Sequence, residues 1–145
     1  MNANQIIERT FESTRHKTSY LEAGPHDGQL MFFIHGWPEL GLVWRGQIEY
    51  FAEAGWRCVA PDMRGYGNSS VPDRIDSYAI SEIVTDMIEL HNALSNKPAT
   101  WIGHDWGCPV VWALAAQHSE RCRSVINLCV PYFARGFAID TILPY

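Results

Sequence analysis

Short apolar-rich runs alternate along the chain with longer segments in which apolar residues recur every three or four positions. Runs of strand length that are bounded by polar or turn residues predict four buried strands, at residues 30–34, 57–60, 100–102 and 125–130. Helical spacing of the apolar residues predicts three helices, at residues 43–54, 79–94 and 109–117. Because strands and helices alternate in this order, the pattern predicts an α/β fold, a mostly parallel sheet with helices on both faces.

The first part of the chain has a different pattern. Residues 11–21 mix polar residues with Thr, Tyr and Phe and end before Gly24 and Pro25, which predicts a pair of exposed antiparallel strands. No internal repeat or flexible linker interrupts the 145 residues, so we expect a single domain or part of one.

Composition and charge exclude several classes of protein. Eleven Lys and Arg against sixteen Asp and Glu give a net charge of -5, and the basic residues are scattered, so we expect no nucleic-acid binding. No stretch approaches the roughly 18 to 20 apolar residues of a membrane span. The four cysteines form no C-x-x-C pair and lie mostly in apolar segments, which predicts reduced thiols. Together with a start that lacks the pattern of a secretory signal, this predicts a cytoplasmic location.

Three motifs follow predicted strands, where an open parallel sheet collects its reactive groups. The sequence GHDWGC at residues 103–108 places Asp105 between small residues, as in a nucleophile elbow, whose tight turn exposes the central side chain in a strained conformation. The sequence HGWP at residues 35–38 forms a turn that can aim a backbone N–H toward that elbow. The third motif is DMRGYGNS at residues 62–69.

Together and in this order, the three motifs resemble the amino-terminal half of an α/β-hydrolase of the epoxide hydrolase type, over residues 30–131. The resemblance implies that Asp105 is a nucleophile that opens a small apolar epoxide, and that water then hydrolyses the ester to a vicinal diol. It also implies that the backbone N–H groups of Trp37 and Trp106 stabilise the oxyanion of that second step. A carboxyl group with an ordinary pKa of about 3.9 is ionised at neutral pH and needs no base to attack. We therefore expect no cofactor and no metal.

The resemblance also implies that parts of the machinery lie beyond this sequence. In the family, the tyrosines that protonate the epoxide oxygen belong to a cap domain, and the water-activating His and its acid partner follow later strands. We expect residues 1–130 to form the amino-terminal part of the hydrolase core and residues 131–145 to lead into the cap. The chain is then a fragment with an exposed apolar sheet edge and negligible turnover, although a stable ester on Asp105 can accumulate.

Other interpretations stay open. A haloalkane dehalogenase shares the Asp nucleophile and holds the halide with a Trp that follows it, as Trp106 does, although that family usually has His-Gly-Asn-Pro where this chain has Trp37. A non-catalytic fragment, or one piece of a complemented enzyme, is the third hypothesis. Asp105 could instead cap a helix, and Trp37 could be a packed core aromatic. A dinucleotide-binding loop is disfavoured because Ser70 replaces the third glycine of its motif.

The remaining polar and aromatic candidates receive structural roles. Asp62 and Arg64 are expected to make loop contacts. Four tryptophans fit apolar positions of the core, namely Trp44, Trp56, Trp101 and Trp112. None of the six histidines is a convincing general base, namely His16, His26, His35, His91, His104 and His118.

Overall fold

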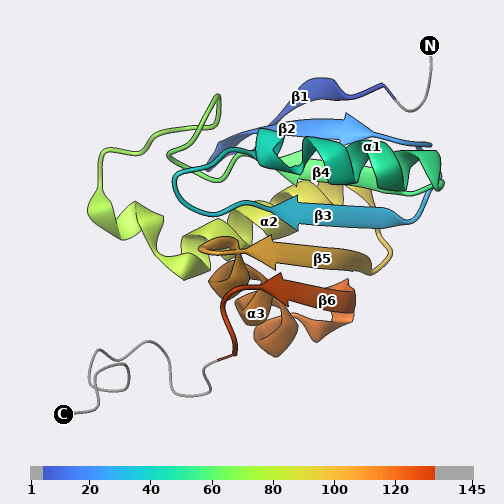
Figure 1. Cartoon of the computed structure of the whole chain (residues 1–145). Helices are drawn as coiled ribbons and strands as arrows, with labels where there is room; N and C mark the ends of the chain where they lie inside the picture. Colours follow the sequence, from blue (N-terminus) through green and yellow to red (C-terminus); the bar gives the residue numbers. More distant parts are fainter. Residues whose placement is uncertain (1–4, 133–145) are drawn as a thin grey trace.

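The computed structural model describes residues 5–132, which form a six-stranded sheet with helices on both faces (Figure 1). The strands are β1 (Ile7–Glu12), β2 (Lys17–Ala23), β3 (Leu30–Ile34), β4 (Arg57–Pro61), β5 (Ala99–His104) and β6 (Cys122–Leu128). The α-helices are α1 (Arg45–Glu53), α2 (Ile80–Leu94) and α3 (Gly107–Gln117), with short 3₁₀ turns η1 (Gly41–Trp44), η2 (Ile75–Tyr78) and η3 (Ser119–Arg121). The expected α/β fold is confirmed.

The sheet has the order β1-β2-β4-β3-β5-β6. β3 pairs in parallel with β4 and β5, and β5 pairs in parallel with β6, whereas the hairpin β1–β2 joins antiparallel to β4. Helix α1 lies in front of the sheet and α2 and α3 lie behind it (Figure 1). The connections that leave β3 and β5 therefore run to opposite faces, which opens a crevice between the carboxyl ends of these two neighbouring strands.

The buried residues of the strands alternate between two cores, as a pleated strand requires. Phe32 and Ile34 pack with α2 and α3 in the larger core, where Phe32 stacks on Trp101 with ring centroids 4.2 Å apart. Met31 and Phe33 face the other way and pack against Trp44 and helix α1. This burial on both faces explains why β3 appears in the sequence as an unbroken apolar run.

Several predicted boundaries differ from the structure. The hairpin begins at Ile7 and ends at Ala23, so it extends past the predicted residues 11–21 at both ends. The helix expected at residues 43–54 starts as the 3₁₀ turn η1 and becomes α-helical only at Arg45, and helix α3 starts two residues earlier than expected. β6 starts at Cys122 and ends at Leu128, earlier than the predicted residues 125–130, because an edge strand tolerates the polar residues with which it begins. The proposed lead into a cap, residues 131–145, lies almost entirely outside the residues that the structure describes.

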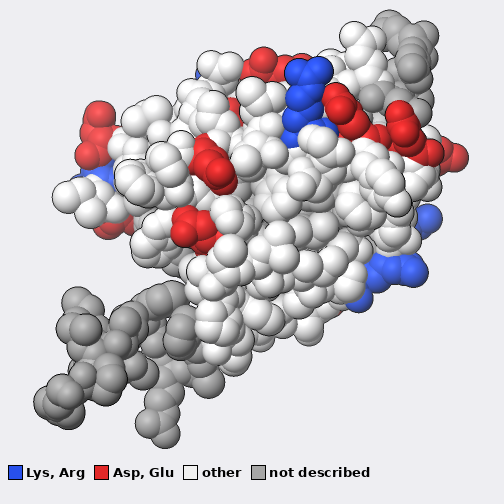
Figure 2. All heavy atoms as spheres, in the orientation of Figure 1, with Lys and Arg blue, Asp and Glu red and all other residues white. Residues whose placement is uncertain are grey.

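Three observations describe the charge and the hydrophobicity of the described residues. On the face drawn in Figure 2, acidic residues gather along the upper rim, while the few basic side chains stay apart and form no continuous patch. Within residues 5–132, no helix has both the length and the apolar character needed to cross a membrane. At the β6 end of the sheet, Ile126 and Leu128 are 46% and 44% exposed, in keeping with the expected apolar edge.

Candidate functional site

The three sequence motifs meet at the crevice between β3 and β5. Ile34, the last residue of β3, pairs in register with Gly103 of β5, so the turns that follow these two strands start side by side. The first turn contains residues 35–38 and the second contains Asp105 and Trp106. The structure therefore brings the predicted site residues together at the position where open α/β sheets bind ligands.

Asp105 occupies a strained turn between β5 and α3. Its φ is 50°, a left-handed conformation that non-glycine residues rarely adopt and that is frequent at functional sites. The small neighbours are required, because a Cβ on Gly107 would lie 2.2 Å from the carbonyl oxygen of Ile34, and one on Gly103 would lie 2.7 Å from Oδ1 of Asn127. The N-cap position of helix α3 is occupied by Trp106, which makes no side-chain cap hydrogen bond, so Asp105 is not the N-cap residue of this helix.

The Asp105 carboxylate is held by main-chain N–H groups. The Trp37 N–H donates a 2.9 Å hydrogen bond to Oδ1. Hydrogen bonding by the N–H groups of Trp37, first, and Trp106 lowers the pKa of Asp105 below its ordinary value, so this carboxyl stays ionised at neutral pH. The two loops approach so closely that a Cβ on Gly36 would lie 2.4 Å from Cβ of Asp105.

Only the main chains of the two tryptophans face the carboxylate as donors. The side chain of Trp37 is 66% exposed and that of Trp106 is 56% exposed. The packed-core interpretation of Trp37 is therefore wrong. A hollow of about 210 Å³ lies beside the carboxylate and is lined by Asp105, Trp106, Pro109 and Val130, which gives an anionic group an otherwise mostly apolar surrounding.

Two residues that lie within the sequence motifs have roles in the site that sequence reasoning did not assign. His35 is fully buried and forms hydrogen bonds to both flanking loops, through Nδ1 to the Gly36 carbonyl and through Nε2 to the Met63 N–H. Tyr66 packs edge-on against this imidazole, with ring centroids 4.9 Å apart. Burial and, next, the charge of Asp105 raise the pKa of the Tyr66 phenol. No local pattern in the sequence reveals either role, because both depend on contacts between loops far apart in the chain.

Asp62 and Arg64 of the third motif make structural loop contacts, as expected. Oδ1 of Asp62 accepts a 2.8 Å hydrogen bond from the Gly41 N–H. The buried guanidinium of Arg64 binds both carboxylate oxygens of Asp86 on α2, each at 2.6 Å, and a third donor reaches the Ser77 carbonyl. These contacts anchor the loop after β4 to helix α2.

The other titratable groups are engaged elsewhere. His104 lies next to Asp105 in the chain, but its ring contacts Trp44 edge-on and its Nδ1 is 3.4 Å from Oε2 of Glu39. The four cysteines, all within the described part of the chain, are free thiols, as expected. In that same part, no cluster of three or more histidine, cysteine or acidic side chains is arranged to hold a metal ion.

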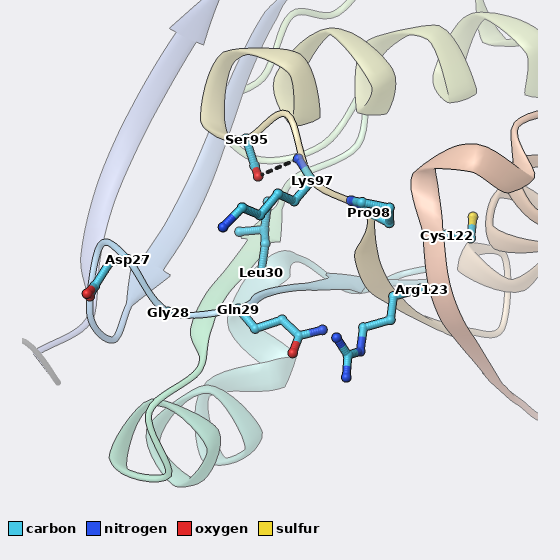
Figure 3. Close-up of a pocket in the computed structure, with 9 residues that line it drawn as sticks. All are labelled: Asp27, Gly28, Gln29, Leu30, Ser95, Lys97, Pro98, Cys122 and Arg123. Atoms are coloured by element: carbon cyan, nitrogen blue, oxygen red, sulfur yellow. Dashed lines mark hydrogen bonds between the residues drawn. The ribbon is translucent and has the colours of Figure 1, made fainter.

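A larger hollow of about 460 Å³ lies at the opposite end of the strands (Figure 3). Its wall comes from the residues that precede or start β3, β5 and β6, including Gln29, Pro98 and Arg123. The side chains of Lys97 and Arg123 border it, and the Ser95 hydroxyl accepts a hydrogen bond from the Lys97 N–H. None of the predicted site residues lines this hollow.

Comparisons with known proteins agree with the geometry. The sequence model of the alpha/beta hydrolase fold family matches residues 29–144. Epoxide hydrolase A of Mycobacterium tuberculosis is 38% identical over 129 residues, which are 89% of this chain and 40% of that protein.

Solved structures of epoxide hydrolases are similar as well. Epoxide hydrolase A of Mycobacterium thermoresistibile superposes with a TM-score of 0.89 and 37% identity over 95% of this chain and 43% of that one. An epoxide hydrolase of Vigna radiata superposes with a TM-score of 0.86 and 37% identity over 90% of this chain and 40% of that one. The chain thus spans about two fifths of the length of these relatives. On its sequence and its fold, it belongs to the α/β-hydrolase fold family.

Proposed function

We propose that the chain carries the nucleophilic half of an epoxide hydrolase active site. Asp105 is the nucleophile at an elbow between β5 and α3, and the backbone N–H groups of Trp37 and Trp106 form the oxyanion hole. The observation that carries the proposal is the 2.9 Å hydrogen bond from the Trp37 N–H to Oδ1 of a carboxylate on a left-handed turn. The named relatives are epoxide hydrolases, which supports the same chemistry.

In this proposal the two carboxylate oxygens have different roles. Oδ1 is held by Trp37, so Oδ2 is the oxygen that attacks the less hindered carbon of the epoxide. The C–O bond of the ring breaks, its electron pair moves to the epoxide oxygen, and that oxygen takes a proton from an acid or from water. Asp105 is then an ester whose carbonyl oxygen is Oδ1, the oxygen that accepts the hydrogen bond from the Trp37 N–H.

The donors act mainly in the second step. Water attacks the ester carbon, and negative charge develops on Oδ1 in the tetrahedral intermediate, which collapses to the diol and the free carboxylate. One such donor typically contributes about 3 to 4 kcal/mol to this transition state. Water must be activated by a base, and among the described residues His35 is bound on both ring nitrogens while His104 pairs with Glu39. We therefore propose that this chain alone forms the ester and hydrolyses it very slowly.

The surroundings of the carboxylate suggest the class of substrate. The hollow beside Asp105 is bordered by Trp106, Pro109 and Val130, so a small apolar epoxide fits it better than a charged one. An ionised carboxylate needs no cofactor for the first step. A cytoplasmic location is proposed on the four free cysteines, two of which are buried.

Intact-mass spectrometry of the chain with styrene oxide tests the proposal. One equivalent of the reagent should add its full mass, and fragmentation should place it on Asp105. The Asp105→Asn variant should give no adduct, whereas Asp73→Asn, which removes an exposed carboxylate, should react like the parent chain. Equal labelling of several carboxylates, or unchanged labelling of Asp105→Asn, would show that Asp105 is not an activated nucleophile.

A second reagent separates the two chemistries that share an Asp nucleophile. A bromoalkane gives the same kind of ester but releases bromide, so it adds the mass of the alkyl group alone. Faster reaction with the bromoalkane than with the epoxide would favour the dehalogenase hypothesis. We expect the epoxide to react faster, because Trp37 stands where haloalkane dehalogenases usually have asparagine and because the named relatives are epoxide hydrolases.

A further inference from the structure

His35 stands between the oxyanion turn and the loop that follows β4. Its ring is completely buried, with Nδ1 2.9 Å from the Gly36 carbonyl oxygen and Nε2 2.9 Å from the Met63 nitrogen. A backbone N–H can only donate, so Nε2 must accept from Met63 and carry no proton. The neutral imidazole therefore has its proton on Nδ1, which donates to the Gly36 carbonyl.

The Gly36 carbonyl and the Trp37 N–H belong to the same planar peptide group. A trans peptide group is rigid, and its C=O and N–H point in opposite directions. A donor that holds the carbonyl on one side thereby aims the N–H on the other side, and that N–H donates to Oδ1 of Asp105 at 2.9 Å. The Gly36 carbonyl also accepts from the Glu39 N–H at 3.0 Å, which closes the turn.

We propose that His35 is a positioning residue that fixes the Gly36–Trp37 peptide plane, with its tautomer selected by the Met63 N–H. This role rests on the proposed function of Asp105 and adds a link between the loop after β4 and the oxyanion hole. The link runs from Met63 through the imidazole and the Gly36 carbonyl to Trp37, and ends on the nucleophile.

The surroundings of His35 keep the ring in the neutral form that the link requires. Burial lowers the pKa of His35 below its ordinary value. The hydrogen bond to the Gly36 carbonyl and then the charges of Asp62 and Glu39 act on this pKa in the opposite direction. Tyr66 packs against the ring edge-on. A protonated ring would have to break the bond to Met63, since both nitrogens would then be donors.

Two substitutions separate positioning from simple packing. The side-chain nitrogen of asparagine occupies roughly the place of Nδ1, so His35→Asn retains a donor for the Gly36 carbonyl. The amide group of glutamine reaches the place of Nε2 instead, so His35→Gln retains the contact to Met63 and loses that donor. His91→Gln is the matched control, because His91 is also buried and its ring also bonds a backbone carbonyl, that of Lys97.

The first measurement needs no substrate. Long-range proton–nitrogen NMR of the parent chain should show His35 as the neutral Nδ1–H tautomer. Hydrogen exchange at the Trp37 amide should be about fivefold faster in His35→Gln, because the loss of one neutral hydrogen bond changes an equilibrium by about that factor. In His35→Asn the exchange rate should stay closer to that of the parent chain. The pKa of Asp105 should rise in His35→Gln. An Nε2–H tautomer, or equal exchange in all variants, would overturn the proposal.

The second measurement follows the chemistry. Hydroxylamine attacks an ester through a tetrahedral oxyanion and leaves a protein hydroxamate of defined mass while releasing the diol. This reaction of the Asp105 ester should be about fivefold slower in His35→Gln than in His91→Gln. If the parent chain forms no ester, the proposed function is wrong. The tautomer of His35 and hydrogen exchange at the Trp37 amide then still test the role of His35. If the ester forms and both variants react alike, the role of His35 is wrong and the nucleophile stands.

Discussion

Replacing Gly36 by alanine tests the contact between the two loops of the site. A Cβ at this position would lie 2.4 Å from Cβ of Asp105 and 2.6 Å from its Oδ1. Carbon atoms that are not bonded pack at about 3.5 to 4.0 Å, so the two loops must separate by roughly 1 Å. The Trp37 N–H now lies 2.9 Å from Oδ1, and the same displacement takes it beyond hydrogen-bonding distance.

The size of the effect follows from the loss of this donor. Removal of one oxyanion donor costs about 3 to 4 kcal/mol in the transition state, which is roughly a 10²- to 10³-fold lower rate. The loss should appear where charge develops on Oδ1, namely in cleavage of the ester by hydroxylamine. The pKa of Asp105 should rise as well, because hydrogen bonding by the Trp37 N–H is the largest cause of its low value.

The assay compares ester cleavage in Gly36→Ala with that in Gly46→Ala. Gly46 lies on the exposed side of α1, and a Cβ there meets nothing within 4 Å. The control should cleave at the parent rate and gain about 0.5 to 1 kcal/mol of stability from the better helix former. Ester cleavage at the parent rate by a folded Gly36→Ala chain would refute the reasoning, since the clash is built into the parent geometry.

Three further predictions concern stability and are measured by urea unfolding. Gly107→Ala should cost about 3 kcal/mol, because its Cβ would lie 2.2 Å from the backbone oxygen of Ile34, and a loss under about 1 kcal/mol would contradict the close packing. Asp86→Ala should cost about 3 to 5 kcal/mol, since it leaves the buried Arg64 guanidinium without its carboxylate, and a neutral result would contradict that pairing. Burial lowers the pKa of three histidines, so stability should fall as the pH drops below about 6.5, by at most about 1.4 kcal/mol per pH unit for each of His16, His35 and His91. Stability falls at low pH because the unfolded chain binds protons that the native chain does not bind. The dependence of stability on pH should be weaker in His91→Gln.

Much of the fold could be predicted from the sequence where one physical factor dominates. β3 is buried on both faces, so its apolar run marks Leu30–Ile34 without ambiguity. The first helical segment ends next to its predicted end at residue 54, because Gly55 adopts the left-handed conformation with a φ of 88°. The predicted range of β6 begins too late because this strand lies at an edge of the sheet. Arg123 and Ser124 remain exposed there, so the apolar pattern starts only after them.

In the candidate site, too, local features could be predicted from the sequence and contacts between loops could not. The strained turn at Asp105 was predictable, because its need for small neighbours appears directly in GHDWGC. The contribution of His35 was not, because it depends on the Met63 N–H from a different loop, and a buried histidine after a strand has no local signature. The exposed indole of Trp37 was also missed, since hydropathy alone favours burial of an aromatic side chain.

The register between β3 and β5 has a practical consequence for labelling this protein. Adding one residue to either turn at the carboxyl ends would shift Asp105 against Trp37, so these turns have no freedom in length. The turn at residues 95–98 lies at the other end of the strands, beside the larger hollow, and Asn96 is exposed there. A fluorophore or a short epitope belongs at Asn96, where it can report on the chain while the reactive carboxylate keeps its partners.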